Sequence, residues 1–341
     1  MGQVIERARL ERLLETVERW QGKRVLVVGD LVADELVVGR PLGVAREAPV
    51  MVLEHVSREV LPGGATNPAA NARALGAAVS VCGVVGDDET GRALSKELAA
   101  RGIDTAGVHV DPTRPTTTKT RIWAGGAQQH VQQLMLRLDR VERRPVSGDV
   151  TEALASYVET ALEDADALMF SDYENGVIHP ALIDACLLAA KRRGVTVTVD
   201  AHGGLERFRG ATLFTPNQPE AEATLGHVMA DSHALELGGS ELLKRLGATA
   251  LLITRGQEGM SLFTPGSAGR HVRTVESAAV DPTGAGDTVA AAFTLAVVAG
   301  AALEDAVTLA SVAASIVVAR VGTAVATRDD ITSSLRSLAV R

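Results

Sequence analysis

Short apolar runs alternate with helical stretches along most of this chain, and no other feature constrains its fold as strongly. Each run is brief and largely uncharged, as in a buried strand, and most are followed by a longer segment with helical periodicity. Strands and helices that alternate at this spacing build a mostly parallel sheet covered on both faces. We therefore predict a doubly wound α/β fold with strands at 24–30, 79–85, 167–170, 195–199, 211–214 and 250–254.

Two segments, 35–61 and 116–137, depart from this pattern because they contain strand-like runs and turn residues without a helix. We expect them to pair as a small β-sheet lid over the site. A flat apolar face on that lid would be a natural contact between two copies, so a homodimer through the lid is expected. The chain then divides into an N-terminal helix at 1–22, a main domain at 23–330 that carries the lid, and a C-terminal tail at 331–341.

The composition argues against nucleic-acid and membrane partners. The formal net charge is −8, which is the wrong sign for binding a polyanion. No uncharged apolar run reaches the roughly 18 residues that span a bilayer, and the first residues lack the apolar core of a secretion signal. Cys82 and Cys186 lie in apolar runs without metal-type spacing, which favours buried, reduced thiols in a cytoplasmic protein.

The stretch 281–288, Asp-Pro-Thr-Gly-Ala-Gly-Asp-Thr, stands directly before an apolar helical run. Unpaired N–H groups at a helix start bind anions, and glycine lets the backbone approach a phosphate closely. Asp287 would then hold a carboxylate in the first turn, where it could accept a hydroxyl proton during phosphoryl transfer. The alternative is a turn whose Asp287 only complements the helix dipole. Local spacing alone leaves both interpretations open.

Polar residues near two other strand ends are candidates for binding a hydroxylated ligand. Asp30 and Asp34 follow the first predicted strand, at the edge where open parallel sheets bind ligands. Gly63, Gly64 and Asn67 lead into a helix, where an amide side chain offers both a donor and an acceptor. Exposed loop acids and a helix N-cap are the competing interpretations.

Asn217 and Glu220 lie three residues apart at another helix start, so both can face one point. Mg²⁺ keeps several waters and uses few protein ligands, so a water-mediated magnesium site is one interpretation. A capping box, in which Asn and Glu satisfy each other's backbone amides, is the other. Further polar residues that follow apolar runs are Asp172, Asp200, Thr254 and Arg255.

Together these motifs resemble the ribokinase-like (PfkB) carbohydrate kinase family over residues 23–327. The resemblance rests on Gly63-Gly64-x-x-Asn67 and on the 281–288 stretch, with Asn217-x-x-Glu220 between them. It implies an ATP-dependent sugar kinase on a doubly wound α/β fold with a β lid. It also implies Mg²⁺ as the cofactor that accompanies ATP, and a small sugar or sugar phosphate as the second substrate.

The resemblance assigns roles residue by residue. Asp287 would be the catalytic base, beside an anion hole of the Gly284, Ala285 and Gly286 amides. The substrate would be bound by Asp30, Asp34, Gly63, Gly64 and Asn67, with Lys119, Arg121 and Arg137 as phosphate anchors from the lid. ATP would lie along Asn217, Glu220, Thr254, Arg255, Gly256, Gly259 and Ser311, and Asn217 and Glu220 would support Mg²⁺ through water.

Within the family, the chain is most similar to the kinase domain of enzymes that phosphorylate D-glycero-D-manno-heptose 7-phosphate at O1. The stretches that carry this likeness include Gly29-Asp-Leu-Val-Ala-Asp34 and Ser171-Asp-Tyr173. Asn175 and His202 stand where those kinases carry lysines, and Ser311 where they carry Asn. Loss of two cations removes charge-assisted contacts to phosphate. A kinase of a different sugar, nucleoside or sugar phosphate, and a non-catalytic sugar- or nucleotide-binding regulator, are the alternatives.

Overall fold

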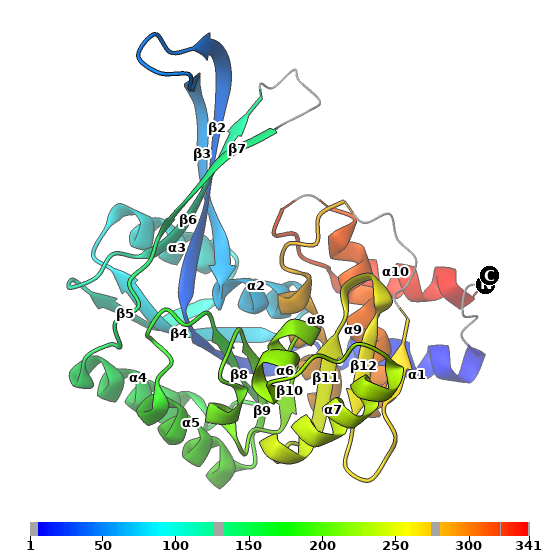
Figure 1. The fold of residues 1–341 in the computed structure, drawn as a ribbon. Coiled ribbons are helices and arrows are strands. Elements are labelled where there is room, and N and C mark those ends of the chain that lie inside the picture. The colour runs from blue at the N-terminus through cyan, green and yellow to red at the C-terminus, as the bar shows by residue number, and fades with distance from the viewer. Residues whose placement is uncertain (1–5, 126–132, 274–279, 321, 340–341) are drawn as a thin grey trace.

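A computed structural model describes residues 6–125, 133–273, 280–320 and 322–339 of the chain. A nine-stranded sheet, in the order β13-β12-β11-β10-β9-β8-β1-β4-β5, forms the centre of the main domain (Figure 1). The strands from β5 to β11 pair in parallel, and β12 and β13 add an antiparallel edge. The strands are β1 (Arg24–Gly29), β4 (Ala78–Gly86), β5 (Asp104–Asp111), β8 (Ala167–Asp172), β9 (Thr196–Ala201), β10 (Leu213–Phe214), β11 (Ala250–Thr254), β12 (Met260–Phe263) and β13 (Arg270–Val272).

Helices cover both faces of this sheet, as the doubly wound prediction required. One face is covered by α1 (Arg7–Glu18), α2 (Thr66–Ala74), α3 (Glu89–Ala100), α8 (Ala285–Val298), α9 (Leu303–Val318) and α10 (Arg328–Ala339). The other is covered by α4 (Gly148–Ala161), α5 (Pro180–Arg193), α6 (Gln218–Leu225) and α7 (Ser232–Leu246).

The central strand β1 shows how the sequence divides the core between these two faces. Val25 and Val27 belong to one buried cluster, whereas Leu26 and Val28 belong to the other. Successive side chains of a strand point to opposite faces, so a continuous apolar run fills both layers at once. This is why the buried strands appear in the sequence as unbroken apolar runs.

The predicted lid is a four-stranded sheet in the order β3-β2-β6-β7 that projects from the main domain (Figure 1). Its strands are β2 (Leu31–Val44), β3 (Met51–Gly64), β6 (Thr117–Ala124) and β7 (Gln133–Arg140). The predicted pairing of the two segments is present, because β2 pairs in parallel with β6. The strands continue further towards the main sheet than expected, and residues 126–132 of the predicted lid segment 116–137 lie outside the described residues.

Two differences from the sequence interpretation concern the outer parts of the fold. Strand β5 was not predicted, because it is an edge strand that contains few large apolar residues. The segment 331–341, expected to be a tail, is largely the helix α10. Its Ile331 and Leu335 are fully buried, and the helix packs on α1, which explains why it is ordered. Among the described helices, none is both long enough and apolar enough to cross a membrane.

Candidate active site

Helix α8 places Asp287 in its first turn, at the base of the lid. Gly284 caps the helix with φ of 77°, and a Cβ there would lie 2.6 Å from the Asn67 side-chain nitrogen. Only glycine meets both constraints without strain. A Cβ added to Gly286 would meet no atom within 4 Å, so the backbone is open to a ligand on that side.

The predicted anion hole is present in part. The Ala285 amide donates to the Pro282 carbonyl oxygen at 3.2 Å, so it already has a partner. The amides of Gly284 and Gly286 donate to no acceptor among the residues that the structure describes. Two of the three predicted donors are therefore available to an anion.

The carboxylate of Asp287 is buried and held by two side chains. Asn67 Nδ2 donates to its Oδ2 at 2.6 Å, and the Tyr173 hydroxyl lies 3.3 Å from its Oδ1. Burial raises the pKa of Asp287 to about 6, although these two hydrogen bonds oppose the rise. A carboxyl group with this pKa is ionised at neutral pH and still basic enough to accept a proton.

Asp30, predicted to bind the substrate, forms hydrogen bonds that hold the loop at 173–177 in place. Its carboxylate accepts hydrogen bonds from the backbone amides of Tyr173, Asn175 and Val177, at 2.9, 3.0 and 3.2 Å. Asp30 is 1% exposed, and burial raises its pKa to about 6. The geometry gives Asp30 an organising role behind the site, and its direct contact with a substrate stays a prediction.

Asp34 and the two predicted glycines lie where β2 and β3 meet the main domain. Asp34 Oδ1 is 2.9 Å from an Arg121 guanidinium nitrogen, an ion pair whose angles do not make a hydrogen bond. A Cβ on Gly63 would approach the Asp34 carboxyl carbon to 2.8 Å. Gly64 has φ of 52°, and a Cβ there would clash with Val32. Both glycines are therefore required by packing, whether or not their amides also bind a ligand.

The three predicted lid cations share one face of the lid. Lys119 stands opposite Asp34 and Asp139 in the strand register, and Arg121 stands opposite Arg137. Residues two apart on a strand point to the same side of the sheet, so Lys119, Arg121 and Arg137 lie on one face of the lid. Arg137 is paired with Asp139 at 2.6 Å. Lys119 has no ion-pair partner among the described residues, and its ammonium group lies 4.6 Å from the centre of the Tyr173 ring.

Tyr173 is a site residue that the sequence motifs did not single out as a ligand. Its hydroxyl contacts Asp287, and its ring meets Lys119 of the lid on one side and the His202 ring, 4.3 Å away, on another. In the sequence, the signal that could have identified Tyr173 as a site residue was its position directly after the buried strand β8. Burial and the Asp287 charge raise the pKa of Tyr173 well above its ordinary value, so it is a hydrogen-bond donor.

Asn217 and Glu220 form the capping box that was one of their two interpretations. Asn217 Oδ1 accepts from the Glu220 amide at 2.9 Å, and a Glu220 carboxylate oxygen accepts from the Asn217 amide at 2.8 Å. The other Glu220 oxygen contacts His202 Nδ1 at 2.8 Å, which raises the pKa of His202. Both predicted ligands are thus already hydrogen-bonded, and their water-mediated contact with Mg²⁺ stays a prediction.

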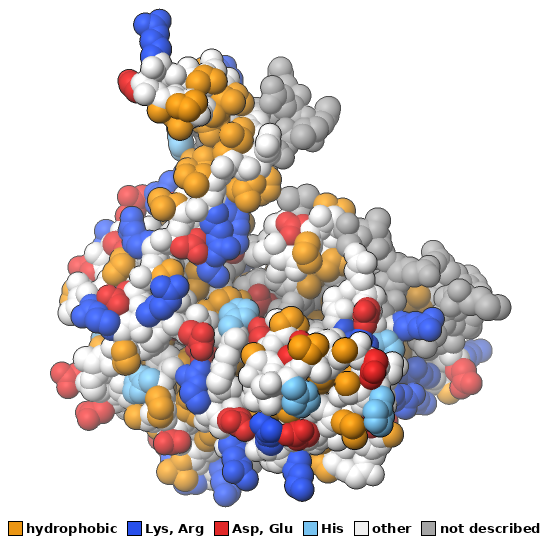
Figure 2. Space-filling model, viewed as in Figure 1, with side chains coloured by type: hydrophobic (Ala, Val, Ile, Leu, Met, Phe, Trp, Pro, Cys, Tyr) orange, Lys and Arg blue, Asp and Glu red, His pale blue; other side chains and the backbone are white. Residues whose placement is uncertain are grey.

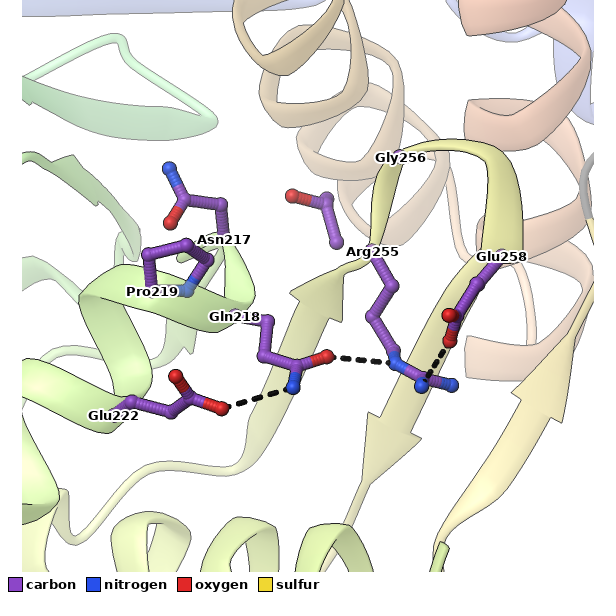
Figure 3. Close-up of a pocket in the computed structure, with 8 residues that line it drawn as sticks. Asn217, Gln218, Pro219, Glu222, Arg255, Gly256 and Glu258 are labelled. Atoms are coloured by element: carbon purple, nitrogen blue, oxygen red, sulfur yellow. Dashed lines mark hydrogen bonds and ion pairs between the residues drawn. The ribbon is translucent and has the colours of Figure 1, made fainter. Parts of the chain in front are cut away.

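A pocket of about 380 Å³ opens beside this capping box (Figure 3). Asn217, Thr254, Arg255 and Gly256, all predicted to bind ATP, line it together with four further residues, Gln218, Pro219, Glu222 and Glu258. Arg255 donates to Gln218 at 3.0 Å and also contacts Glu258.

Three predicted ATP residues do not line this pocket: Glu220 of the capping box, Gly259 and Ser311. The Gly259 carbonyl oxygen accepts from the Arg255 amide at 2.8 Å and closes the adjoining turn. Ser311 is 1% exposed within α9, and its hydroxyl has no hydrogen-bond partner among the described residues. Contact of any of these three residues with a nucleotide stays a prediction.

Acidic side chains lie close together near Asp287. Burial, together with the charges of Asp287 and Glu220, raises the pKa of Asp200 to about 8. The described residues contain no group of three His, Cys, Asp or Glu side chains that could enclose a metal ion. The donor chemistry suits Mg²⁺, which binds carboxylate oxygens and retains waters, better than a metal that needs a closed protein cage.

Comparison with known proteins identifies the family. Residues 23–330 match the profile described as "pfkB family carbohydrate kinase". The chain belongs to the pfkB family of carbohydrate kinases. It is an ATP-dependent sugar kinase, as the resemblance in the sequence implied.

Several similar curated proteins carry the name "Bifunctional protein HldE". The protein from Pelobacter propionicus is 40% identical over 299 residues, which cover 87% of this chain and 60% of that protein. The protein from Geobacter metallireducens is 40% identical over 311 residues, which cover 91% of this chain and 62% of that protein. The chain thus spans about three fifths of the length of these relatives.

Solved structures confirm the ribokinase-like fold. Arabidopsis thaliana ribokinase complexed with ribose and ATP superposes with a TM-score of 0.71 at 22% identity, covering 93% of this chain and 99% of that one. Phosphofructokinase-2 from Escherichia coli in complex with potassium gives 0.74 at 19% identity, with the same coverage. At these identities the likeness bears on the fold alone.

Proposed function

We propose that this kinase transfers the γ-phosphoryl group of ATP to O1 of D-glycero-D-manno-heptose 7-phosphate. The observation that carries the proposal is the place of Asp287, buried at the start of α8 between the lid cations and the pocket at Asn217. The similarity to the HldE proteins over about nine tenths of the chain favours the heptose substrate. The stretches at 29–34 and 171–173, quoted above for this likeness, lie at this site.

In the proposed reaction Asp287 accepts the proton of the attacking hydroxyl as the new O–P bond forms. The Gly284 and Gly286 amides stabilise negative charge on the transferring group, because they are fixed donors with no other acceptor among the described residues. Mg²⁺, when bound with ATP, neutralises phosphate charge. Since the pKa of Asp287 is about 6, we expect kcat/KM to fall as the pH decreases through that value.

The far end of the substrate would meet the lid. Lys119 is the lid cation best suited to a sugar phosphate, since its ammonium group lies against Tyr173 rather than against a carboxylate. Arg121 and Arg137 would have to exchange Asp34 and Asp139 for the phosphate. Closure of the lid over both substrates would exclude water and limit wasteful hydrolysis of ATP.

A kinase of a different sugar is the second candidate, and the observation that favours it is the loss of two expected lysines. Asn175 is 6% exposed, so its side chain does not replace a phosphate-binding cation at the surface. His202 is better placed, because it stands between Tyr173 and Glu220 at the site. His202 could therefore take the place of one of the two lysines, whereas Asn175 does not replace the other.

A substrate panel separates the two candidates. ADP release is measured with Mg²⁺ and ATP against heptose 7-phosphate, the free heptose, other free sugars, other sugar phosphates and nucleosides. We expect the highest kcat/KM with heptose 7-phosphate. A higher value with an unphosphorylated sugar would overturn the heptose assignment and leave the kinase intact.

The base is tested with Asp287→Asn, which keeps the size of the side chain. We expect it to fold and bind ATP but to lose turnover by about 10²- to 10⁴-fold, the range of a general base. Glu206→Gln, an exposed change in the short 3-10 helix Leu205–Phe208, is the matched control and is expected to keep full turnover. Retained turnover in Asp287→Asn would contradict the mechanism.

We propose further that two copies associate through the lid. Ten of its large apolar side chains are exposed, and hydrophobic atoms gather on the lid in the space-filling view (Figure 2). They are Leu42, Val44, Val50, Met51, Val52, Val56, Leu134, Met135, Leu136 and Leu138. Exposed apolar side chains gathered on this scale mark an interaction surface.

A further inference from the structure

Three buried polar side chains behind Asp287 form a hydrogen-bond chain that joins α2 to α8. Thr288 Oγ1 donates to Asn71 Oδ1 at 2.8 Å, and Asn71 Nδ2 donates to Asn67 Oδ1 at 3.2 Å. Asn67 Nδ2 then donates to Asp287 at 2.6 Å. Thr288 and Asn71 are fully buried, so a substrate cannot reach either of them.

The direction of this chain is fixed by a backbone atom. Asn71 Nδ2 also lies 3.1 Å from the Asn67 carbonyl oxygen, which can only accept a hydrogen bond. The Asn71 amide must therefore turn its NH₂ group towards Asn67 and its oxygen towards the Thr288 hydroxyl. Asn67 in turn must offer its oxygen to Asn71, which leaves its NH₂ group for Asp287.

Reversing either amide would place two acceptors against each other inside the core. A buried polar group without a partner is costly, and hydrogen bonds aligned in one direction strengthen one another. The chain thus prevents Asn67 from presenting its oxygen to Asp287, an arrangement that would repel the carboxylate.

We propose that Asn71 and Thr288 are positioning residues, which act through Asn67 to keep the Asp287 carboxylate oriented and ionised for catalysis. The proposal rests on the proposed role of Asp287 as the base. According to this proposal, the reactivity of Asp287 also depends on Asn71 and Thr288, two residues that contact neither substrate. It also gives Asn67, predicted as a sugar ligand, a role in holding the base.

The test titrates Asp287 directly, so it does not depend on the substrate. Protein labelled with ¹³C at the aspartate carboxyl groups is titrated by NMR, and the Asp287 signal is assigned from its absence in Asp287→Asn. Asn71→Asp removes the NH₂ donor at constant shape but adds a carboxyl group, so its effect is compared with that of Thr288→Val, which adds no charge. We expect the pKa of Asp287 to rise by about one unit or more, since Asn67 can then turn its NH₂ group to residue 71.

A second pair of variants covers the case in which Asn71→Asp does not fold. Thr288→Val removes the first donor at constant shape, and Thr288→Ser restores it. We expect Thr288→Val to raise the pKa of Asp287 and to lower kcat about tenfold or more, with KM for both substrates little changed and Thr288→Ser close to wild type. A residue that only supports packing would lower stability without moving this pKa.

Each result decides one of two questions. An unchanged Asp287 pKa in folded Asn71→Asp, or an equal pKa in Thr288→Val and Thr288→Ser, overturns the positioning role. Wild-type protein that phosphorylates nothing in the substrate panel overturns the proposed function instead, whatever the titration shows.

Discussion

Asp287 shows at the scale of one residue how a useful base destabilises the fold that holds it. Burial raises its pKa from the ordinary value of 3.8 to about 6. Between these pH values the native protein keeps a proton that the unfolded chain has released, so stability falls as the pH rises. Above pH 6 the native state is less stable by about 3 kcal/mol than it would be without the shift.

We therefore expect Asp287→Asn to raise the free energy of unfolding by about 1 to 3 kcal/mol at pH 8, and to leave it nearly unchanged at pH 4. The amide still offers an oxygen to Asn67. Urea unfolding at the two pH values measures the difference.

Asp139→Asn is a control of opposite sign for this measurement. The Arg137 guanidinium lowers the pKa of Asp139, so its charge stabilises the native state. Its replacement is expected to decrease stability at pH 8. Asp287→Asn that is less stable than wild type at pH 8 would refute the account of its buried charge.

At the scale of the element, the start of α6 serves two purposes that variants can separate. Asn217 caps the helix, so Asn217→Ala is expected to lower the free energy of unfolding by about 1 kcal/mol. Asn217→Asp keeps the accepting oxygen and should keep that stability. If ATP phosphates lie here, its added charge should raise the KM for ATP about tenfold.

Asp231→Ala is the matched control for the cap. Asp231 accepts from the Ala234 amide at 2.8 Å at the start of α7, and it does not line the pocket. Its replacement should decrease stability to a similar extent without changing the KM for ATP, measured with the best substrate of the panel. An unchanged KM in Asn217→Asp would remove Asn217 from the ATP site.

The elements that the sequence predicted well are those whose own apolar pattern is enough to identify them as part of the core. The apolar run at Val25 to Val28 packs into both core clusters. Helix α8 is apolar on nearly all sides because most of its residues are buried against neighbouring elements. Strand β5 escaped prediction because edge strands need fewer apolar residues. Helix α10 escaped because its few apolar residues become significant only against α1.

At the scale of the whole molecule, the site residues predicted from the sequence were those in local motifs. Asp287 with its glycines and Asn217 with Glu220 each form a local motif, so spacing singled them out as candidates, although it left two interpretations of each motif open. Tyr173 was not found as a ligand, because its meaning depends on contacts with Asp287, 114 positions away, and with Lys119 of the lid. Sequence spacing carries no information about such distant contacts.

We expect the lid to take part both in substrate binding and in dimerisation, because its two faces carry different kinds of side chains. Lys119, Arg121 and Arg137 share one face, and the strand register places Leu136 and Leu138 on the other. The charged face suits a phosphorylated substrate. The leucine face, with side chains 54% and 61% exposed, suits a second copy of the chain.

We expect the double variant Leu136→Glu with Leu138→Glu to convert a dimer to a monomer, because paired copies would bury four carboxylates against apolar groups. Sedimentation equilibrium measures the mass, which should fall from twice the monomer value to the monomer value. Leu188→Glu, a change of similar exposure on α5, is the control and should leave the mass unchanged. Since β7 carries Arg137 between the two leucines, a monomer is also expected to show a higher KM for the sugar phosphate. Wild-type protein that sediments as a monomer at micromolar concentration would exclude the lid as a stable dimer contact.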